Sequence, residues 1–353
     1  MFSKNIDRRS FTKAGIAIAT GALIESTPFA SAFSKGEELF VNSWGGSFTA
    51  AETEAFYKPF GAAEGVKVEA VTPVSFAKLK AQVQSGVYDF DLVDTNPIDY
   101  EEAKFQGLLE PVDLSVLDKS RLTPGIVEDF GVQSFALSTC LAYRTDKFKN
   151  NPPKTWVDFF DVERFPGNRA MFDRAYTALG IALVADGVPI KDIYPLDIDR
   201  AFAKLDKIKP HIKTWWNQTT QSQQLIRDGD VDILPMTNGR AQELADNGEP
   251  VSISWDGAEL FMSYWMVPKG TPRAKLAWKF INFASQPKPA SAFGARMHYG
   301  PANLKAFDFI AADVQGKMPT APSNVAKSFE VDGKWLAPRM PELNERWYAW
   351  RAK

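Results

Sequence analysis

The residue types that most often carry enzymatic chemistry are scarce in this chain of 353 residues. It contains one cysteine, Cys140, and two histidines, His211 and His298, and neither histidine has a cysteine or acidic partner at metal-ligand spacing. Cys140 lies in the apolar stretch STCLAY, so we expect a buried, inert thiol, and we expect His211 at a helix end or on the surface. These patterns predict no enzymatic activity, no cofactor and no metal site, and they favour a binding protein.

A tryptophan and two glycines follow the first expected strand, in the segment NSWGGSF (residues 42–48). This segment lacks the lysine and the glycine spacing of a phosphate-binding loop, and it does not match the turn that holds a nucleophilic serine. A flat aromatic face attracts an amine through apolar contact and a cation–π interaction of about 0.5–2 kcal/mol. We therefore interpret Trp44 as a flat wall for a ligand, with Gly45 and Gly46 letting the backbone approach that ligand closely.

Other aromatic residues are also expected at the ends of strands. They are Tyr176, Trp215, Trp216, Trp255, Tyr264, Trp265 and Tyr299. For each ring taken singly, packing in a core is favoured over contact with a ligand, and Trp265 in the middle of an expected strand is compatible with either role. The number of these rings at strand ends is consistent with a site for an amine-containing ligand.

The composition indicates a globular protein large enough for two lobes. Of all residues 45% are hydrophobic and 13% aromatic, and the formal net charge is −2. Without a basic excess, nucleic acid and anionic membranes are not expected as partners. No uncharged apolar run of about 18 residues follows the N-terminal segment, and a single cysteine allows no internal disulfide. We expect a monomer that binds a small molecule.

The N-terminal segment has the features of an export signal. Arg8 and Arg9, followed by Phe11 and Lys13, match the twin-arginine pattern, and the short apolar stretch IAIATGALI follows. An A-x-A site at residues 30–32 completes the signal. The alternative is a helical arm with an accidental arginine pair. We expect residues 1–32 to be a cleaved signal peptide and the mature protein to be periplasmic.

Strand-like and helix-like segments alternate in the rest of the chain, which is typical of an α/β fold. We expect strands at 38–41, 65–72, 89–95, 135–148, 230–236, 250–255 and 259–270. We expect helices at 76–86, 100–107, 174–187, 194–213 (with Asp197 as the N-cap), 274–285, 303–314 and 340–353.

Several stretches resemble the periplasmic solute-binding proteins of ABC importers, specifically the spermidine/putrescine-binding type. They are LFVNSWGGSFTAAETEAFYKPFGAAEGVKVE, AKLKAQVQSGVYDFDLVD, ALVADGV, YPLDIDRAFAKLDKI, WW, MTNGRA, YWMVPKGTP, WKFINFASQP and YGPAN. Each stretch is weak alone, but their order spans nearly the whole mature chain. The resemblance also extends to a branch of the family that binds small amino acids such as γ-aminobutyrate.

This resemblance implies a type II periplasmic binding protein with two α/β lobes and the ligand in the cleft between them. Lobe 1 would comprise residues 33–140 and 268–353, with the C-terminal helices returning to lobe 1 or bracing the hinge. Lobe 2 would comprise residues 141–267. Two hinge strands would cross between the lobes near 138–145 and 262–268.

The resemblance also implies where the ligand binds. In polyamine binders, acidic residues of the second lobe hold the ammonium groups, whereas this chain has Arg174, Thr177 and Ser263 at those positions. A buried arginine disfavours a polycation but suits a carboxylate in bidentate geometry. Arg174 in lobe 2 and Asp94 in lobe 1 would then clamp a small zwitterion. Alternatively, Arg174 pairs with Asp173, and Asp94 caps the turn DTNP.

Other polar and aromatic residues complete the candidate ligand site. They are Gly45, Thr95, Ser138, Thr139, Tyr176, Trp216, Gln221, Asn238, Phe261 and Tyr264, and each is equally compatible with a turn, cap or core position. We interpret the chain as the substrate-binding component of an ABC transporter that delivers an amine-containing solute to its permease. The first alternative is a polyamine receptor with Glu259 or Asp256 at the cation site, and the second is a secreted enzyme on the same fold.

Overall fold

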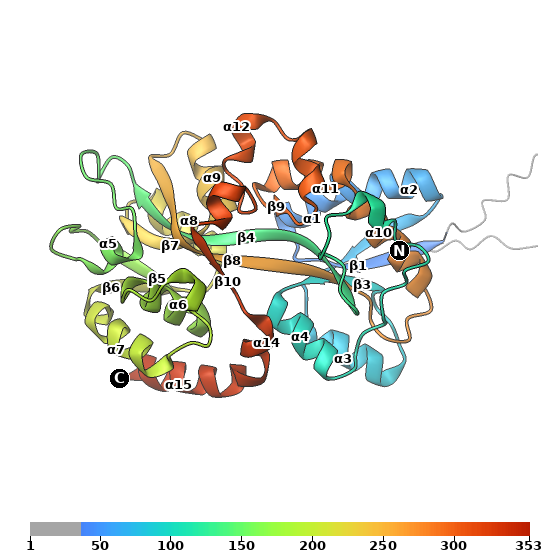
Figure 1. Cartoon of the computed structure of the whole chain (residues 1–353), viewed down its shortest axis with the longest axis horizontal. Helices are drawn as coiled ribbons and strands as arrows, with labels where there is room; N and C mark the ends of the chain where they lie inside the picture. Colours follow the sequence, from blue (N-terminus) through green and yellow to red (C-terminus); the bar gives the residue numbers. More distant parts are fainter. Residues whose placement is uncertain (1–36) are drawn as a thin grey trace, which may run out of the picture. The chain divides into compact units, whose positions relative to one another are not determined.

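The computed structural model describes residues 37–353, so the expected signal peptide (residues 1–32) lies outside the described residues. The strands of this part form a ten-stranded sheet in the order β2-β1-β3-β8-β4-β7-β5-β6, with β10 beside β8 and β9 beside β4 (Figure 1). The strands are β1 (Glu38–Asn42), β2 (Lys67–Val71), β3 (Leu92–Thr95), β4 (Gly131–Arg144), β5 (Arg169–Phe172), β6 (Ile212–Trp216), β7 (Ile233–Thr237), β8 (Val251–Met266), β9 (Gly300–Pro301) and β10 (Ser328–Glu330).

Two long antiparallel strands, β4 and β8, form the middle of this sheet and run side by side in Figure 1. On one side β3 pairs with the end of β8, and β1 and β2 continue the sheet in parallel; with their helices they form lobe 1. On the other side β7 pairs with β4, and β5 and β6 complete lobe 2. Both long strands therefore cross from one lobe to the other.

Strand β8 joins two segments for which the sequence predicts separate strands, 250–255 and 259–270. Thr139 of β4 pairs with Glu259, but Leu141 pairs with Ser254, so β8 bulges between these two positions. Gly257 lies in the bulge with φ of 75°, a conformation that glycine adopts without strain. The two predicted strands are therefore one continuous strand, and the bulge lies where the sequence predicts the gap between them.

The sheet is flanked by helices and short helical turns. The helices are α1 (Gly46–Glu52), α2 (Lys58–Glu64), α3 (Phe76–Ser85), α4 (Pro97–Phe105), α5 (Trp156–Phe160), α6 (Ala175–Ala185), α7 (Ile198–Ile208), α8 (Thr219–Arg227), α9 (Asn238–Asp246), α10 (Ala274–Ala284), α11 (Pro287–Met297), α12 (Ala312–Gln315), α13 (Pro322–Val325), α14 (Gly333–Leu336) and α15 (Met340–Ala352). Asp197 caps α7 as predicted, because its side chain accepts a hydrogen bond from the Arg200 amide. The predicted helix at 303–314 is instead a 3-10 turn followed by the short α12.

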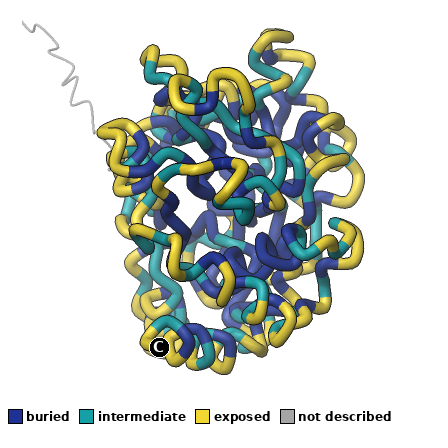
Figure 2. The backbone as a smooth tube through the Cα atoms, turned by 90° about the vertical axis from the view of Figure 1, so that its left-hand side faces the viewer, coloured by how far each residue is buried: buried dark blue, intermediate teal, exposed yellow. Residues whose placement is uncertain are grey.

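Each lobe has its own core, and Figure 2 shows buried backbone inside and exposed backbone at the loops. In lobe 1, Trp265 and Phe280 are buried between the sheet, α10 and α11, so Trp265 is a core residue. In lobe 2 the apolar helix α6 is buried along nearly its whole length. Cys140 is buried as predicted, and burial raises the pKa of its thiol well above the usual value.

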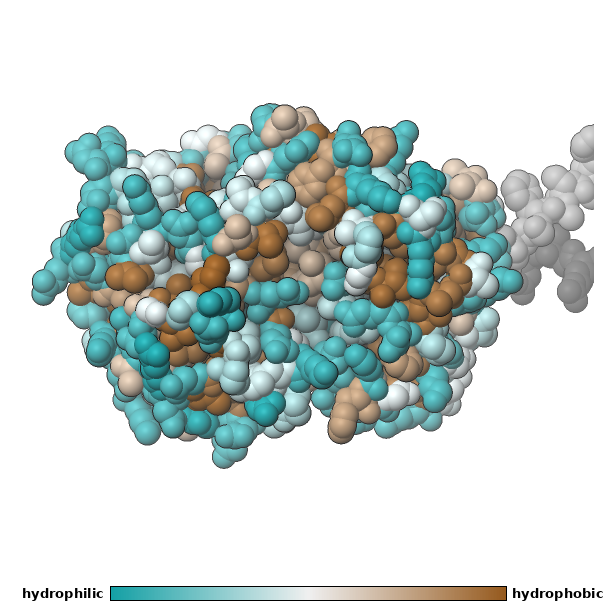
Figure 3. Space-filling view, viewed as in Figure 1, coloured by the Kyte–Doolittle hydropathy of each residue, from teal (hydrophilic) through white to brown (hydrophobic). Residues whose placement is uncertain are grey.

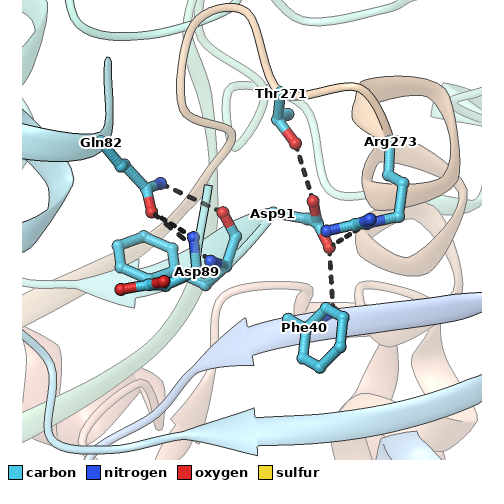
Figure 4. A network of polar contacts seen from close by, with 7 residues as sticks. Phe40, Gln82, Asp89, Asp91, Thr271 and Arg273 are labelled. Atoms are coloured by element: carbon cyan, nitrogen blue, oxygen red, sulfur yellow. Dashed lines mark hydrogen bonds and ion pairs between the residues drawn. The ribbon is translucent and has the colours of Figure 1, made fainter. Parts of the chain in front are cut away.

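An ion pair between Arg273 and the buried Asp91 connects the segment after β8 to lobe 1 (Figure 4). Asp91, just before β3, has no exposed surface; its carboxylate accepts hydrogen bonds from Thr271 Oγ1 (2.7 Å), Arg273 Nε (2.7 Å) and the Phe40 amide (3.0 Å). All these donors approach one carboxylate, which compensates for the cost of burying its charge. The chain after β8 is thereby fixed beside β1 and β3.

The C-terminal helix α15 packs on lobe 2, which differs from the expectation that the C-terminal helices join lobe 1 or brace the hinge. Trp347 Nε1 donates to Asp173, and Trp350 Nε1 donates to Asp206, each at 2.7 Å. Their rings also contact Trp215. The preceding α14 contacts α4 of lobe 1, so the segment after β10 crosses between the lobes (Figure 1).

The face of the molecule in Figure 3 is mostly hydrophilic, with several hydrophobic areas among the hydrophilic residues. Within residues 37–353, none of the helices combines the length and the hydropathy of a membrane span.

Candidate ligand-binding site

The carboxyl ends of parallel strands in both lobes carry most of the candidate residues. In lobe 1, Trp44 follows β1, and Asp94 and Thr95 end β3. In lobe 2, Arg174 follows β5, and Trp216 ends β6. Open α/β sheets bind ligands outside the carboxyl ends of their strands. The topology therefore supports a site at these strand ends, beside the central strand β4.

Asp94 is a fully buried carboxyl group on the lobe 1 side. Its Oδ2 accepts a hydrogen bond from Ser134 Oγ (2.5 Å), and its Oδ1 has no partner in the described chain. Burial raises the pKa of Asp94 well above the usual value and nearby Glu52 raises it further, whereas the side chains of Ser134 and Trp44 lower it. The alternative capping role belongs to Asn96, whose side chain accepts from the Asp99 amide (2.8 Å).

The loop after β1 presents Trp44 to solvent, with 45% of this residue exposed. Gly45 has φ of 90°, and its N–H donates to Thr49 Oγ1 at 2.9 Å. A side chain at this φ would be strained, so the glycine has a conformational reason to be there. The loop is consistent with an accessible aromatic wall beside Asp94.

Arg174 lies directly before α6 on the lobe 2 side. Its guanidinium carbon is 4.0 Å from the centre of the Phe172 ring and 5.5 Å from that of Tyr176. Asp173 bonds instead to Trp347 and pairs with Arg351, which removes the alternative Arg174–Asp173 pair. Arg174 takes part in no ion pair among residues 37–353, and its guanidinium lies near the Tyr176 phenol and the Glu259 carboxylate.

Glu259 is a second fully buried acid, in the middle of β8. Its Oε2 accepts from Thr139 Oγ1 (3.0 Å) and Thr177 Oγ1 (2.9 Å), so two candidate residues hold this carboxylate. Burial raises the pKa of Glu259, and the positive charge of Arg174 lowers it. From the sequence, Glu259 is expected in the site only if the ligand is a polyamine. An acidic residue within the apolar run AELFMSYWM is the sequence feature that could have indicated this buried acceptor.

Tyr299 belongs to the aromatic residues expected at strand ends, but the sequence did not predict it as a ligand-binding residue. Its side chain is largely buried, and a Cβ atom on Gly239 would lie 2.8 Å from its ring. Burial raises the pKa of Tyr299; nearby Arg240 lowers it, and Glu243 and Asp94 raise it further. Ser47, Arg240 and Tyr299 also line a cavity of about 340 Å³.

Two candidate residues have structural partners instead of free polar groups. Asn238 accepts from the Ser138 amide (3.0 Å) and donates to the His298 carbonyl (2.6 Å), so its amide links β4 to the end of α11. Tyr264 stacks on Tyr100 with ring centres 4.2 Å apart. The Asn238 amide and the Tyr264 ring are therefore both held by contacts within the described chain.

The remaining candidates divide between buried and exposed positions. Trp216 is buried and stacks on Phe172 at 3.9 Å. Gln221 is exposed in α8, where it accepts from the Asn217 amide (3.3 Å). The other candidates are buried: Thr95 at the end of β3, Tyr176 in the first turn of α6, and Phe261 and Ser263 inside β8. His211 is exposed at the end of α7, as predicted.

Several buried polar atoms of the strands and strand ends have no hydrogen-bond partner in the described chain. They are Asp94 Oδ1, Ser138 Oγ, Trp216 Nε1, Thr237 Oγ1 and Glu259 Oε1. Buried polar groups in folded proteins are nearly always paired, so such a group of atoms is unusual outside functional sites. This arrangement can bind a small polar solute that brings both donors and acceptors.

Two lobes joined by two central strands, with polar side chains at the facing strand ends, define the class of two-lobed solute-binding proteins. The chain belongs to the family of bacterial extracellular solute-binding proteins, whose model matches residues 55–320. The family expected from the sequence is thereby confirmed. The molecule is the solute-capturing component of an ABC transporter, and a small-molecule ligand and a permease are its partners.

Known relatives cover almost the whole chain. The γ-aminobutyric acid-binding protein of Pseudomonas aeruginosa PAO1 is 35% identical over 331 residues, which are 92% of this chain and 94% of that protein. An ABC transporter substrate-binding protein from Bradyrhizobium japonicum USDA 110 has a TM-score of 0.85 at 34% identity, over 89% of this chain and 99% of its own. The Atu4243-GABA receptor has a TM-score of 0.83 at 34% identity, over 90% and 98%.

Proposed function

We propose that this protein captures a small zwitterion with a carboxylate and an amine, and that γ-aminobutyrate is its first candidate ligand. The carrying observation is Arg174, a stacked guanidinium at the strand ends of lobe 2 without an ion pair among residues 37–353. Arginine presents a planar fork of donors that matches a carboxylate in bidentate geometry. Two relatives with at least 34% identity that are named for γ-aminobutyric acid support this ligand.

Asp94 is the proposed partner of the ligand's amine in lobe 1. Its free Oδ1 is a fully buried acceptor, and an ammonium beside it would stabilise the ionised carboxylate. Trp44 would cover the ligand from the solvent side, where its ring can make a cation–π contact. Because Asp94 and Arg174 lie on opposite lobes, only the closed form would offer both charges to one ligand. Ligand binding would therefore be coupled to lobe closure.

A polyamine is the second candidate ligand, because Glu259 is a second buried carboxylate next to the site. Arg174 lies close enough to lower the pKa of Glu259, so its positive charge would repel a polycation there. We therefore rank the zwitterion first. We also propose that the protein acts without catalysis, as a monomer in the periplasm, after twin-arginine export and cleavage near Ala32.

Calorimetric titration of the mature chain (residues 33–353) tests this function. We expect saturable 1:1 binding of γ-aminobutyrate, and weaker or no binding of α-amino acids, betaine, putrescine and spermidine. Tight polyamine binding without any response to amino acids would contradict the zwitterion.

The same titration with Arg174→Ala tests the proposed carboxylate partner. We expect affinity for γ-aminobutyrate to fall at least about 30-fold, because truncating one member of a desolvated charge pair costs about 2–5 kcal/mol. The matched control is Arg200→Ala, which removes an exposed arginine of the same lobe that pairs with Asp186. Unchanged affinity in Arg174→Ala would remove this residue from the site.

A further inference from the structure

A buried chain of hydrogen bonds lies beneath the Trp44–Gly45 loop and ends on Glu52, the last residue of α1. Glu52 Oε2 accepts from Ser43 Oγ (2.5 Å) and from Tyr57 Oη (2.8 Å). Ser43 Oγ is 2.6 Å from Thr49 Oγ1, which in turn accepts from the Gly45 N–H at 2.9 Å. Through Ser43 and Thr49 the carboxyl group of Glu52 therefore reaches the backbone of the loop that presents Trp44.

The donors in this chain have one consistent direction. The Gly45 N–H donates to Thr49, so the Thr49 hydroxyl is free to donate to Ser43, and the Ser43 hydroxyl then donates to Glu52. Every hydroxyl is thus satisfied when Glu52 acts only as an acceptor. An ionised carboxylate accepts more strongly than a neutral acid, so ionisation of Glu52 tightens the chain that holds the loop.

Glu52 is also close to the charge of Asp94. Glu52 has no exposed surface, and its Oε1 has no partner among residues 37–353. Burial raises the pKa of Glu52 to about 7, while the hydrogen bonds from Ser43 and Tyr57 lower it. Its negative charge raises the pKa of Asp94, so the two buried acids oppose each other's ionisation.

Cations on the neighbouring elements are engaged elsewhere or lie at the surface. Lys58 pairs with Glu54, Lys67 of β2 pairs with Glu69, and Lys279 of α10 pairs with Glu64. Arg296 of α11 lines a surface cavity together with Glu54. The acid facing Glu52 from β3 is Asp94, and the phenol facing it is Tyr57. The described surroundings thus supply hydroxyl groups and an acid around Glu52.

We propose that Glu52 is a positioning residue that holds the Trp44–Gly45 loop through Ser43 and Thr49 and couples capture of an ammonium-bearing ligand to release of a proton. This inference rests on the proposed function, because the ligand's ammonium must bind beside Asp94. An ammonium there stabilises the ionised forms of Asp94 and of nearby Glu52, so binding expels the proton that Glu52 partly holds near pH 7. Affinity for the ligand therefore rises with pH through about 7.

Two variants separate titration from positioning. Glu52→Gln keeps an oxygen that accepts from Ser43 and Tyr57 but cannot ionise. Thr49→Val breaks the link between Gly45 and Ser43 but keeps the carboxyl group. Glu54→Gln is the matched control, because Glu54 is an exposed acid two residues away that pairs with Lys58.

The experiment is titration calorimetry with γ-aminobutyrate from pH 5.5 to 8.5, in buffers of different ionisation enthalpy that count the protons released. We expect wild type and Glu54→Gln to release protons at pH 7. We expect Glu52→Gln to release fewer and to shift its affinity rise to lower pH. Thr49→Val should bind about 5- to 10-fold more weakly with the wild-type number of protons.

Equal proton release in wild type and Glu52→Gln would overturn the coupling, and unchanged affinity of Thr49→Val would overturn the positioning. If γ-aminobutyrate gives no binding heat at any pH, the proposed function fails. The titration of Glu52 is then tested by the pH dependence of the Tm of the ligand-free protein. Glu52 holds its proton to higher pH in the folded protein than in the unfolded chain, so between about pH 4.5 and 7 the wild-type Tm should fall relative to that of Glu52→Gln. Identical Tm profiles would overturn the inference.

Discussion

Asp94 and Arg174, the two charges of the proposed clamp, are held in different ways. Asp94 is fixed inside lobe 1 by a hydrogen bond from Ser134, whereas Arg174 is held by stacking on Phe172. The arginine can therefore adjust to a ligand's carboxylate, while the aspartate defines the place of the amine. We therefore predict that Asp94 selects ligands that carry a positive charge, and that Arg174 accommodates the position of the ligand's carboxylate.

The variant Asp94→Asn tests the role of the acid. It keeps the size of the side chain and an acceptor for Ser134 but removes the charge, so we expect at least about 30-fold weaker binding of γ-aminobutyrate. Calorimetry measures the change, and Asp89→Asn, at an exposed position of the same segment, serves as the control. If both variants bind as tightly as wild type, the amine lies elsewhere.

The sequence alone predicted that candidate residues such as Trp44 and Asp94 stand at strand ends, and the structure has them there. It missed partners that only the fold brings together: Glu259 meets Thr177, 82 residues away, and Thr139, 120 residues away. No local pattern encodes such contacts. Gln221 shows the opposite case, because a polar residue near a strand end is exposed on α8 with a local backbone partner.

At the scale of elements, the sequence predicted α15 as a helix but did not place it on lobe 2. Apolar and aromatic positions predict that a helix packs, but they do not identify the surface that receives it. The receiving surface consists of Trp215, Phe202 and the carboxylates of Asp173 and Asp206, which come from three separate segments. Likewise, the bulge at Gly257 made one strand out of two predicted ones.

The packing of α15 gives a prediction about stability. Trp347 is 1% exposed, so Trp347→Ala leaves a cavity and removes a hydrogen bond to Asp173, and the free energy of unfolding should fall by about 3–5 kcal/mol. The neighbouring Tyr348 is 64% exposed, and Tyr348→Ala should change it by less than about 0.5 kcal/mol. Denaturant unfolding compares the two variants. Equal losses would mean that α15 is not held by its buried face.

At the scale of the whole molecule, β4 and β8 cross between the lobes, and other contacts also join them. Asn238 at the start of α9 donates to the His298 carbonyl at the end of α11, and Arg240 is 3.5 Å from Ser47 of α1. These contacts join the lobes beside the strand ends that carry the candidate site. The fold predicted from the sequence, two α/β lobes with two crossing strands, is confirmed by this arrangement and by the related structures.

The most direct test of the central claim is a crystal structure of the mature chain with γ-aminobutyrate. We predict that both carboxylate oxygens lie about 2.7–2.9 Å from guanidinium nitrogens of Arg174, and that the ammonium lies at a similar distance from Asp94. Trp44 should cover the ligand between the two lobes. A carboxylate bound by Arg240, with Arg174 turned to solvent and Asp94 bonded only to Ser134, would contradict the clamp.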